Sequence, residues 1–128
     1  MMFYVADTHA WVLYLLDRLP ERADEVFTQA EDGRACIFVP TIALAECVYL
    51  VEGGKIHLDL GDLLFKLRVG GNFIPASMTL EVVERIHQIP LSEIHDRIIV
   101  ATAQVLGAKV LTKDEEIVNS DVVETIWS

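Results

Sequence analysis

Phe3-Tyr4-Val5-Ala6-Asp7-Thr8-His9 opens the chain with a short apolar run that stops at a carboxylate, where a helical pattern begins. Asp7 carries the only charged side chain among the first sixteen residues. A carboxylate between a buried strand and a buried helix is expected at the carboxyl edge of a sheet, where open α/β folds bind their ligands. The function of the chain therefore depends on which other residues reach this edge.

The rest of the chain repeats this alternation of short apolar strands and helices. Strands are predicted over residues 2–6, 36–39, 73–75, 109–112 and 123–127. Helices are predicted over residues 8–16, 20–31, 41–51, 58–69, 79–88 and 96–106, with a helical turn over 114–118. No two-residue hairpin turn interrupts the series. The pattern predicts an α/β fold, a mostly parallel sheet covered on both faces, as one domain over residues 1–128.

The composition is 52% hydrophobic with a mean hydropathy of +0.38, which is high for a chain of 128 residues. Small domains have much surface per volume, so some apolar surface is expected to need a partner, which indicates an oligomer. The longest uncharged runs, 35–45 and 98–108, are too short to span a membrane, and the chain lacks a signal-peptide pattern. Cys36 and Cys47 are isolated, which is typical of reduced thiols in a cytoplasmic protein.

Acidic residues outnumber basic ones by 20 to 10, which gives a net charge of -10. Such a balance argues against nucleic acid as a ligand, because proteins that bind it usually carry a basic patch. The argument weakens if some acids hold divalent cations, since a bound metal ion reverses the local field. The positions of the acids therefore matter more than their number.

Three aspartates stand at junctions between predicted elements. Asp7 ends the first strand, Asp96 opens an apolar helix, and Asp114 follows the fourth strand by two residues. Each precedes a helical stretch, where Asp is a favoured N-cap worth about 1 kcal/mol, so capping alone would explain its position. In a parallel sheet these strand ends and helix N-termini lie at one edge, so the three carboxylates are also expected to converge.

Glu46 has no capping role, because it lies inside the predicted helix 41–51. It is the only charged residue between Arg34 and Glu52. An ionised carboxylate in such apolar surroundings needs a partner or a metal ion. It could point along a narrow solvated stripe, pair with Arg97 or Lys113, or reach the same edge as Asp7.

Carboxylates that share a cleft raise one another's pKa values unless cations neutralise them. All-oxygen ligation suits Mg²⁺ or Mn²⁺. Such a site fits metal-assisted hydrolysis of phosphodiesters, in which an ion activates water and stabilises charge on the phosphate. Thr112 could orient a ligand or the attacking water. Lys113 and Arg97 are the nearest bases for a phosphate, although each could equally serve a surface ion pair.

The ordered set of acids and their surroundings resembles the PIN domain, and within it the VapC-type ribonuclease toxins of toxin–antitoxin pairs. The resemblance rests on Val5-Ala6-Asp7-Thr8, Glu46, His95-Asp96-Arg97-Ile98-Ile99-Val100-Ala101-Thr102-Ala103 and Leu111-Thr112-Lys113-Asp114. It continues through Ile117 and residues 123–127, and so covers nearly the full length.

The resemblance implies a three-layer α/β/α fold around about five parallel strands. It implies a Mg²⁺- or Mn²⁺-dependent endoribonuclease acting on RNA. Carried over by position, Asp7, Glu46, Asp96 and Asp114 become the catalytic metal ligands, with Thr112 in support. It also implies a homodimer and a cognate antitoxin, whose extended segment would cover an apolar groove and insert a basic side chain into the acidic pocket.

Four histidines could instead suggest a metal-free ribonuclease that uses general acid–base catalysis. His57 and His87 lie in ordinary helical or loop surroundings, which favours a surface or interface role. His9 and His95 are close in sequence to two of the aspartates and could line the cleft. Trp11 has helical spacing and is expected in the core or a dimer interface rather than as a base-stacking platform.

Two other functions compete with a nuclease. A phospho-receiver domain would also place an acid after its first strand, but it needs an early acidic pair and an Asp after the third strand. Phe73-Ile74-Pro75-Ala76 has no acid. A non-catalytic interaction module would keep the fold without the activity. The complete set of four acids argues against such a module, because nothing would retain Glu46 in an apolar helix.

Overall fold

The computed structural model describes residues 1–128, and its central feature is a sheet of five strands. The strands are β1 (Met2–Ala6), β2 (Ala35–Pro40), β3 (Phe73–Ala76), β4 (Lys109–Leu111) and β5 (Thr125–Ile126). Their order in the sheet is β3-β2-β1-β4-β5, and every neighbouring pair is parallel. The α/β class is confirmed, with a sheet that is wholly rather than mostly parallel.

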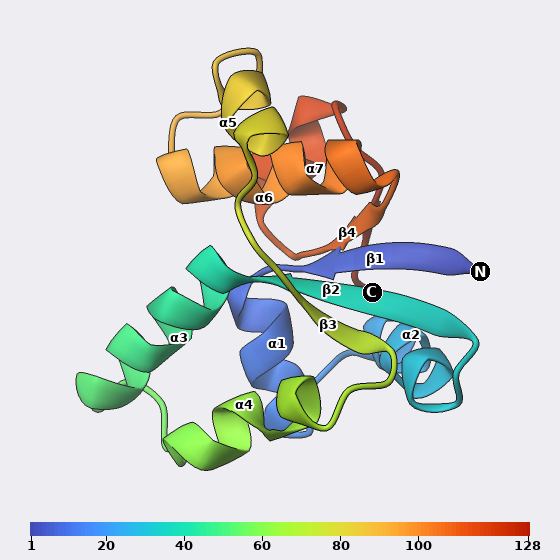
Figure 1. Ribbon diagram of the computed structural model, residues 1–128, viewed down its shortest axis with the longest axis vertical. Coiled ribbons are helices and arrows are strands. Elements are labelled where there is room, and N and C mark those ends of the chain that lie inside the picture. The colour runs from blue at the N-terminus through green and yellow to red at the C-terminus, as the bar shows by residue number, and fades with distance from the viewer.

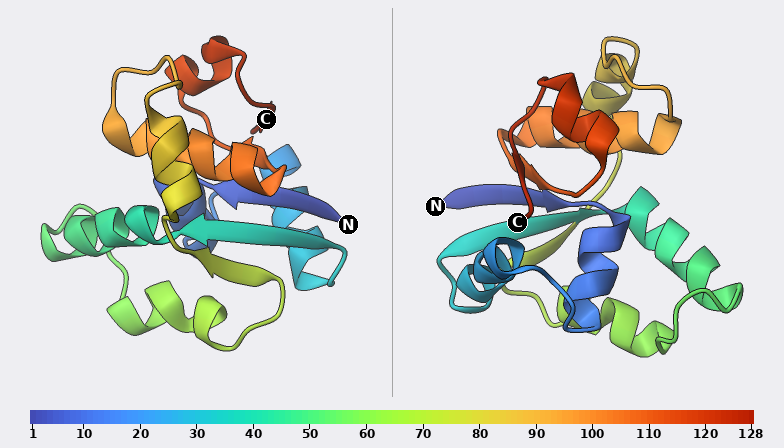
Figure 2. Two further views of the ribbon diagram at one scale, coloured as in Figure 1. Left: turned by 45° about the horizontal axis from the view of Figure 1, so that its top comes forward. Right: turned by 180° about the vertical axis from the view of Figure 1, so that it is seen from behind.

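Helices cover both faces of this sheet (Figures 1 and 2). They are α1 (Thr8–Leu15), α2 (Glu21–Glu31), α3 (Thr41–Glu52), α4 (Leu60–Arg68), α5 (Leu80–Ile86), α6 (Ile94–Leu106) and α7 (Glu115–Ser120). Helices α5, α6 and α7 lie on one side, α1, α2 and α4 lie on the other, and α3 extends from the end of β2. The predicted three-layer α/β/α arrangement is confirmed. No helix combines the length and the apolar character needed to cross a bilayer.

The central strand β1 serves two cores, which explains its unbroken apolar sequence. Successive side chains of a strand point to opposite faces of the sheet. Tyr4 and Ala6 belong to the larger core with Trp11, whereas Val5 packs with Ile99 of α6 on the other face. A strand buried on both faces has no room for polar side chains until it ends.

Trp11 of α1 joins several elements within the larger core. Its side chain is fully buried, and its ring centroid lies 5.8 Å from that of Phe73 and 6.4 Å from that of Phe27. Its indole Nε1 donates a hydrogen bond of 3.1 Å to the carbonyl oxygen of Leu63 in α4. Trp11 is therefore a core residue, as expected, and no nucleic-acid base can reach it.

Every predicted element is present, and no boundary moves by more than two residues. One shift concerns function, because α6 begins before Asp96 rather than at it. The N-cap of α6 is Glu93, whose carboxylate accepts a hydrogen bond of 3.1 Å from the backbone N–H of Asp96. The capping interpretation of Asp96 is therefore wrong, and its side chain is free for another role.

Replacing Trp11 with alanine is expected to lower the free energy of unfolding by about 3–5 kcal/mol, as for other large aromatic residues removed from a core. The substitution opens a cavity and leaves the Leu63 carbonyl unpaired. Urea unfolding followed by circular dichroism measures the loss. The control is Tyr49→Ala in α3, because the Tyr49 side chain is 78% exposed and its removal should change stability by less than about 0.5 kcal/mol. Equal effects of the two substitutions would contradict the role given to Trp11.

Candidate active site

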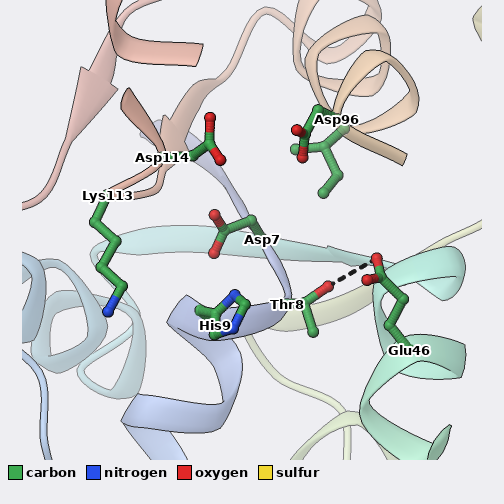
Figure 3. Close-up of a pocket in the computed structure, with 8 residues that line it drawn as sticks. Asp7, Thr8, His9, Glu46, Asp96, Lys113 and Asp114 are labelled. Atoms are coloured by element: carbon green, nitrogen blue, oxygen red, sulfur yellow. Dashed lines mark hydrogen bonds between the residues drawn. The ribbon is translucent and has the colours of Figure 1, made fainter. Parts of the chain in front are cut away.

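A cavity of about 320 Å³ opens where the carboxyl ends of β1 and β4 meet the N-termini of α1, α6 and α7 (Figure 3). Its lining residues are Asp7, Thr8, His9, Glu46, Asp96, Ile99, Lys113 and Asp114. All four acids singled out in the sequence are among them, although they come from four separate elements or junctions. Thr112, the fifth predicted residue, does not line this cavity.

Asp7 lies at the centre of the site, directly after β1. Its backbone N–H donates a hydrogen bond of 3.2 Å to the carbonyl oxygen of Leu111, which continues the pairing of β1 with β4. Its Oδ1 accepts a hydrogen bond of 2.8 Å from the N–H of Ala10 and so caps α1. The residue is only 8% exposed, and it lines the cavity.

Asp114 is held in a similar way at the start of α7. Its Oδ1 accepts a hydrogen bond of 3.0 Å from the N–H of Ile117, so Asp114 is the N-cap of that helix. Its own N–H donates a hydrogen bond of 3.0 Å to the hydroxyl oxygen of Thr112. Figure 3 shows Asp114 and Asp96 on the same side of Asp7. For Asp7 and Asp114, capping a helix is thus compatible with lining the cavity.

Thr112 lies behind the acids rather than among them. Its side chain is fully buried, and its hydroxyl hydrogen bonds to the Asp7 carboxylate and accepts from the N–H of Asp114. Thr112 therefore contacts two of the acids without lining the cavity. A fully buried hydroxyl has no free surface with which to orient a water molecule in the cavity.

The cavity holds more negative charge than its own bases balance. Burial raises the pKa of Asp7, against the opposing effect of its hydrogen bond with Thr112. Burial, followed by the neighbouring charge of Asp114, raises the pKa of Asp96 to about 6. Both shifts oppose ionisation, so a bound cation would stabilise the ionised forms.

Glu46 reaches the cavity from α3 and points toward Thr8 (Figure 3). Its Oε1 accepts a hydrogen bond of 3.1 Å from the Thr8 hydroxyl. The ion pair considered from the sequence is absent, because Glu46 pairs with neither Arg97 nor Lys113. The Arg97 Nε donates instead to the carbonyl oxygen of Leu91. Sequence reasoning missed Thr8, whose only signal is its place directly after Asp7.

The two histidines near the acids differ in their surroundings. His9 lines the cavity beside Asp7. The Nδ1 of His95 lies 2.9 Å from a carboxylate oxygen of Glu93, outside the cavity. His95 lines a separate apolar hollow on α3 instead. Only His9 is therefore placed to contact a molecule bound among the acids.

The donor groups of the cavity suit a hard divalent cation. Asp7, Glu46, Asp96 and Asp114 offer only oxygen atoms, the ligands that Mg²⁺ and Mn²⁺ prefer. No three His, Cys, Asp or Glu side chains form a ready-made ligand set, so these carboxylates would have to draw together around an ion. The raised pKa values of Asp7 and Asp96 give such a movement a driving force, because an ion would stabilise the charged forms that burial disfavours.

Known structures share this arrangement of strands and helices. VapBC2 from Rickettsia felis, bound to a DNA fragment from its promoter, has a TM-score of 0.73 at 16% identity, over 99% of this chain and 100% of that one. A toxin–antitoxin complex from Klebsiella pneumoniae has a TM-score of 0.66 at 16% identity, over 96% and 95%. VapC20 from Mycobacterium tuberculosis, a sarcin–ricin loop cleaving toxin, has a TM-score of 0.68 at 13% identity, over 98% and 99%.

These identities are low enough that the structural likenesses establish the fold alone. A search among curated proteins gave no significant match in sequence. The family model described as PIN domain, in contrast, matches residues 4–122 and so includes all four acids of the cavity. On this match the chain belongs to the PIN domain family.

Proposed function

We propose that this chain is a metal-dependent endoribonuclease, formed by one nuclease domain over residues 1–128. Asp7, Glu46, Asp96 and Asp114 would hold Mg²⁺ or Mn²⁺, and RNA would be the substrate. The observation that carries the proposal is the buried Asp7 carboxylate facing Asp96 and Asp114 in an open cavity with too little positive charge. A phosphodiester would be repelled from such a cavity unless a cation were bound first.

Each residue of the cavity has a separable task in this chemistry. When bound, the ion would lower the pKa of a water molecule and neutralise charge on the phosphate. Asp7 uses Oδ1 to cap α1, which leaves its second oxygen for the ion. Thr112 holds Asp7 and Asp114 in place from behind. Thr8 directs Glu46 toward the cavity. Lys113, on the opposite side from Glu46, can contact a phosphate oxygen.

We further propose that the protein is the toxin of a toxin–antitoxin pair and acts as a homodimer. A hollow of about 420 Å³ next to the cavity is lined by Ile42, Ala45, Tyr49 and Leu50, together with Glu46 and His95. Its apolar character fits a surface that a protein partner covers. The Klebsiella complex and the toxin VapC20 support this biological role by analogy. Growth arrest on expression, relieved by a co-expressed antitoxin, would test it.

The sheet order bears on the alternatives. A phospho-receiver would have the flavodoxin-like order 2-1-3-4-5, whereas this sheet has the order β3-β2-β1-β4-β5. The receiver interpretation is therefore wrong. A non-catalytic module of the same family remains the competing function, and the loss or retention of RNA cleavage decides between them.

Asp7→Asn should reduce RNA cleavage by at least about 100-fold, because losing a metal ligand costs more than losing a residue that supports one. Gel analysis of a labelled RNA with Mn²⁺ or Mg²⁺ measures this loss, and EDTA should abolish cleavage by the unmodified protein. Asp121→Asn is the matched control, since Asp121 is exposed in the left-handed region that Asn tolerates. Persistent cleavage in EDTA, or full activity of both Asp7→Asn and Asp96→Asn, would reject the proposed site.

Asp96→Asn should stabilise the metal-free protein at neutral pH. The folded-state pKa of about 6 exceeds the ordinary value of 3.8, so the folded state binds more protons between these values. The contribution of Asp96 to the free energy of unfolding therefore falls as pH rises from about 4 to about 7. Allowing for solvent screening, the gain at pH 7 is about 1 kcal/mol.

Urea unfolding at several pH values in EDTA measures the effect of Asp96→Asn, with Asp121→Asn as control. The difference between Asp96→Asn and the unmodified protein should shrink toward pH 4, where Asp96 is mostly protonated. Mn²⁺ should raise the melting temperature of the unmodified protein more than that of the variant. Identical pH profiles would show that folding does not raise the pKa of Asp96.

A further inference from the structure

A second hollow adjoins the acidic cavity on the side of Lys113. It has a volume of about 560 Å³, with walls from α2, the β4–α7 connection, α7 and β5. We call it the basic groove, defined by Arg22, Lys113, Asn119, Thr125 and Trp127. Lys113 lines both hollows, and Figure 3 shows it on the side of the acidic cavity away from Glu46. The acidic cavity and the basic groove therefore meet at Lys113.

The two bases of the groove are free to bind a ligand. Arg22 and Lys113 are exposed, and neither forms an ion pair or a side-chain hydrogen bond within the chain. Several other bases are engaged by protein groups: Arg34, Lys66 and Lys109 in ion pairs, and Arg85 and Arg97 in hydrogen bonds. Glu115 is the only acidic side chain on the wall. The wall thus carries two unpaired bases and one acid in a chain whose net charge is -10.

Trp127 gives the groove an aromatic surface. Its side chain is half-buried, because one part packs against the larger core while another lines the groove. Its carbonyl oxygen accepts a hydrogen bond of 3.0 Å from the N–H of Ala23, the residue after Arg22. The Trp127 backbone is therefore held next to the start of α2. Bases and an aromatic ring on one wall are the combination with which proteins bind single-stranded nucleic acids, through phosphate contacts and base stacking.

We propose that the basic groove binds the segment of single-stranded RNA next to the phosphate that is cleaved. Lys113 and Arg22 contact successive phosphates beyond the acidic cavity, and Trp127 stacks on a base. This assignment rests on the proposed nuclease function. The phosphate contacts fix the register of the strand without reading its sequence, so they serve any RNA whose single-stranded part reaches the cavity.

Fluorescence anisotropy with a labelled single-stranded RNA of about twelve nucleotides tests the groove, in EDTA so that cleavage cannot interfere. Each of Arg22→Ala and Lys113→Ala should reduce the slope of log affinity against log salt concentration by about 0.7. Arg22→Lys and Lys113→Arg should keep the slope. Arg34→Ala is the matched control, because Arg34 is exposed just before β2, at the amino end of the strands and away from the acidic cavity, and its removal should leave the slope unchanged.

Intrinsic fluorescence gives an independent readout, since the chain has two tryptophans and Trp11 is fully buried. RNA should quench Trp127 selectively, and Trp127→Phe should remove that quenching. Trp127→Ala should weaken binding roughly tenfold, the effect of losing one stacked base. In cleavage assays, Arg22→Ala should raise KM more than it lowers kcat, because it removes binding shared by substrate and transition state.

Unchanged salt slopes in both alanine variants, or quenching that persists in Trp127→Phe, would overturn the groove assignment. That failure is distinguishable from failure of the nuclease proposal. RNA cleavage that requires metal and Asp7, together with unchanged slopes, would reject the groove alone. Normal slopes and quenching without any metal-dependent cleavage would reject the nuclease and leave a nucleic-acid binding surface. Equal binding of a polyglutamate peptide of matched charge would show a general polyanion site and also overturn the assignment.

Discussion

The repulsion among carboxylates gathered at one edge of the sheet is the constraint on which the rest of the site depends. A parallel sheet brings the ends of β1 and β4 to the same edge, and Asp7 and Asp114 follow those ends. Burial, and to a smaller extent neighbouring charge, opposes the ionisation of Asp7 and Asp96 and raises their pKa values. The chain offsets part of this cost with oriented N–H groups at three helix N-termini, where negative charge is favoured.

Capping and metal binding are not competing explanations for these aspartates. Asp7 and Asp114 each direct one oxygen to a backbone N–H of the following helix, which leaves a second oxygen on the cavity side. The cap fixes the side-chain rotamer, and a fixed rotamer is what a ligand needs to meet its metal ion without an entropic cost. Asp96 reaches the same cavity by another route, because Glu93 caps α6 in its place. Backbone N–H groups thus position the carboxylates of Asp7 and Asp114, and Thr112 contacts both residues.

Most of the fold and the acid set can be predicted from the sequence, because both depend on local patterns. Apolar runs ended by Asp mark strand–helix junctions, and a parallel sheet brings such junctions together. The predictions that fail are those that depend on the direction of a side chain. The Glu46 partner is Thr8 rather than a base, because Arg97 turns back to a loop carbonyl. The basic groove brings together Arg22 and Trp127, which are far apart in sequence, because the N–H of Ala23 donates to the carbonyl oxygen of Trp127, and no local pattern predicts such a contact.

The separation of charge at this edge resolves the objection that a protein of net charge -10 should avoid nucleic acid. Affinity for a polyanion depends on the field along its path and not on the total charge. Glu46 and Lys113 lie on opposite sides of Asp7, so the base of the cavity is on the side away from Glu46. An RNA strand approaching from the basic groove would meet Arg22 and Lys113 before the carboxylates. It would enter the acidic part only where a cation had already reversed the charge. Cleavage would then be confined to metal-loaded protein, because the same carboxylates that hold the ion repel the substrate when it is absent.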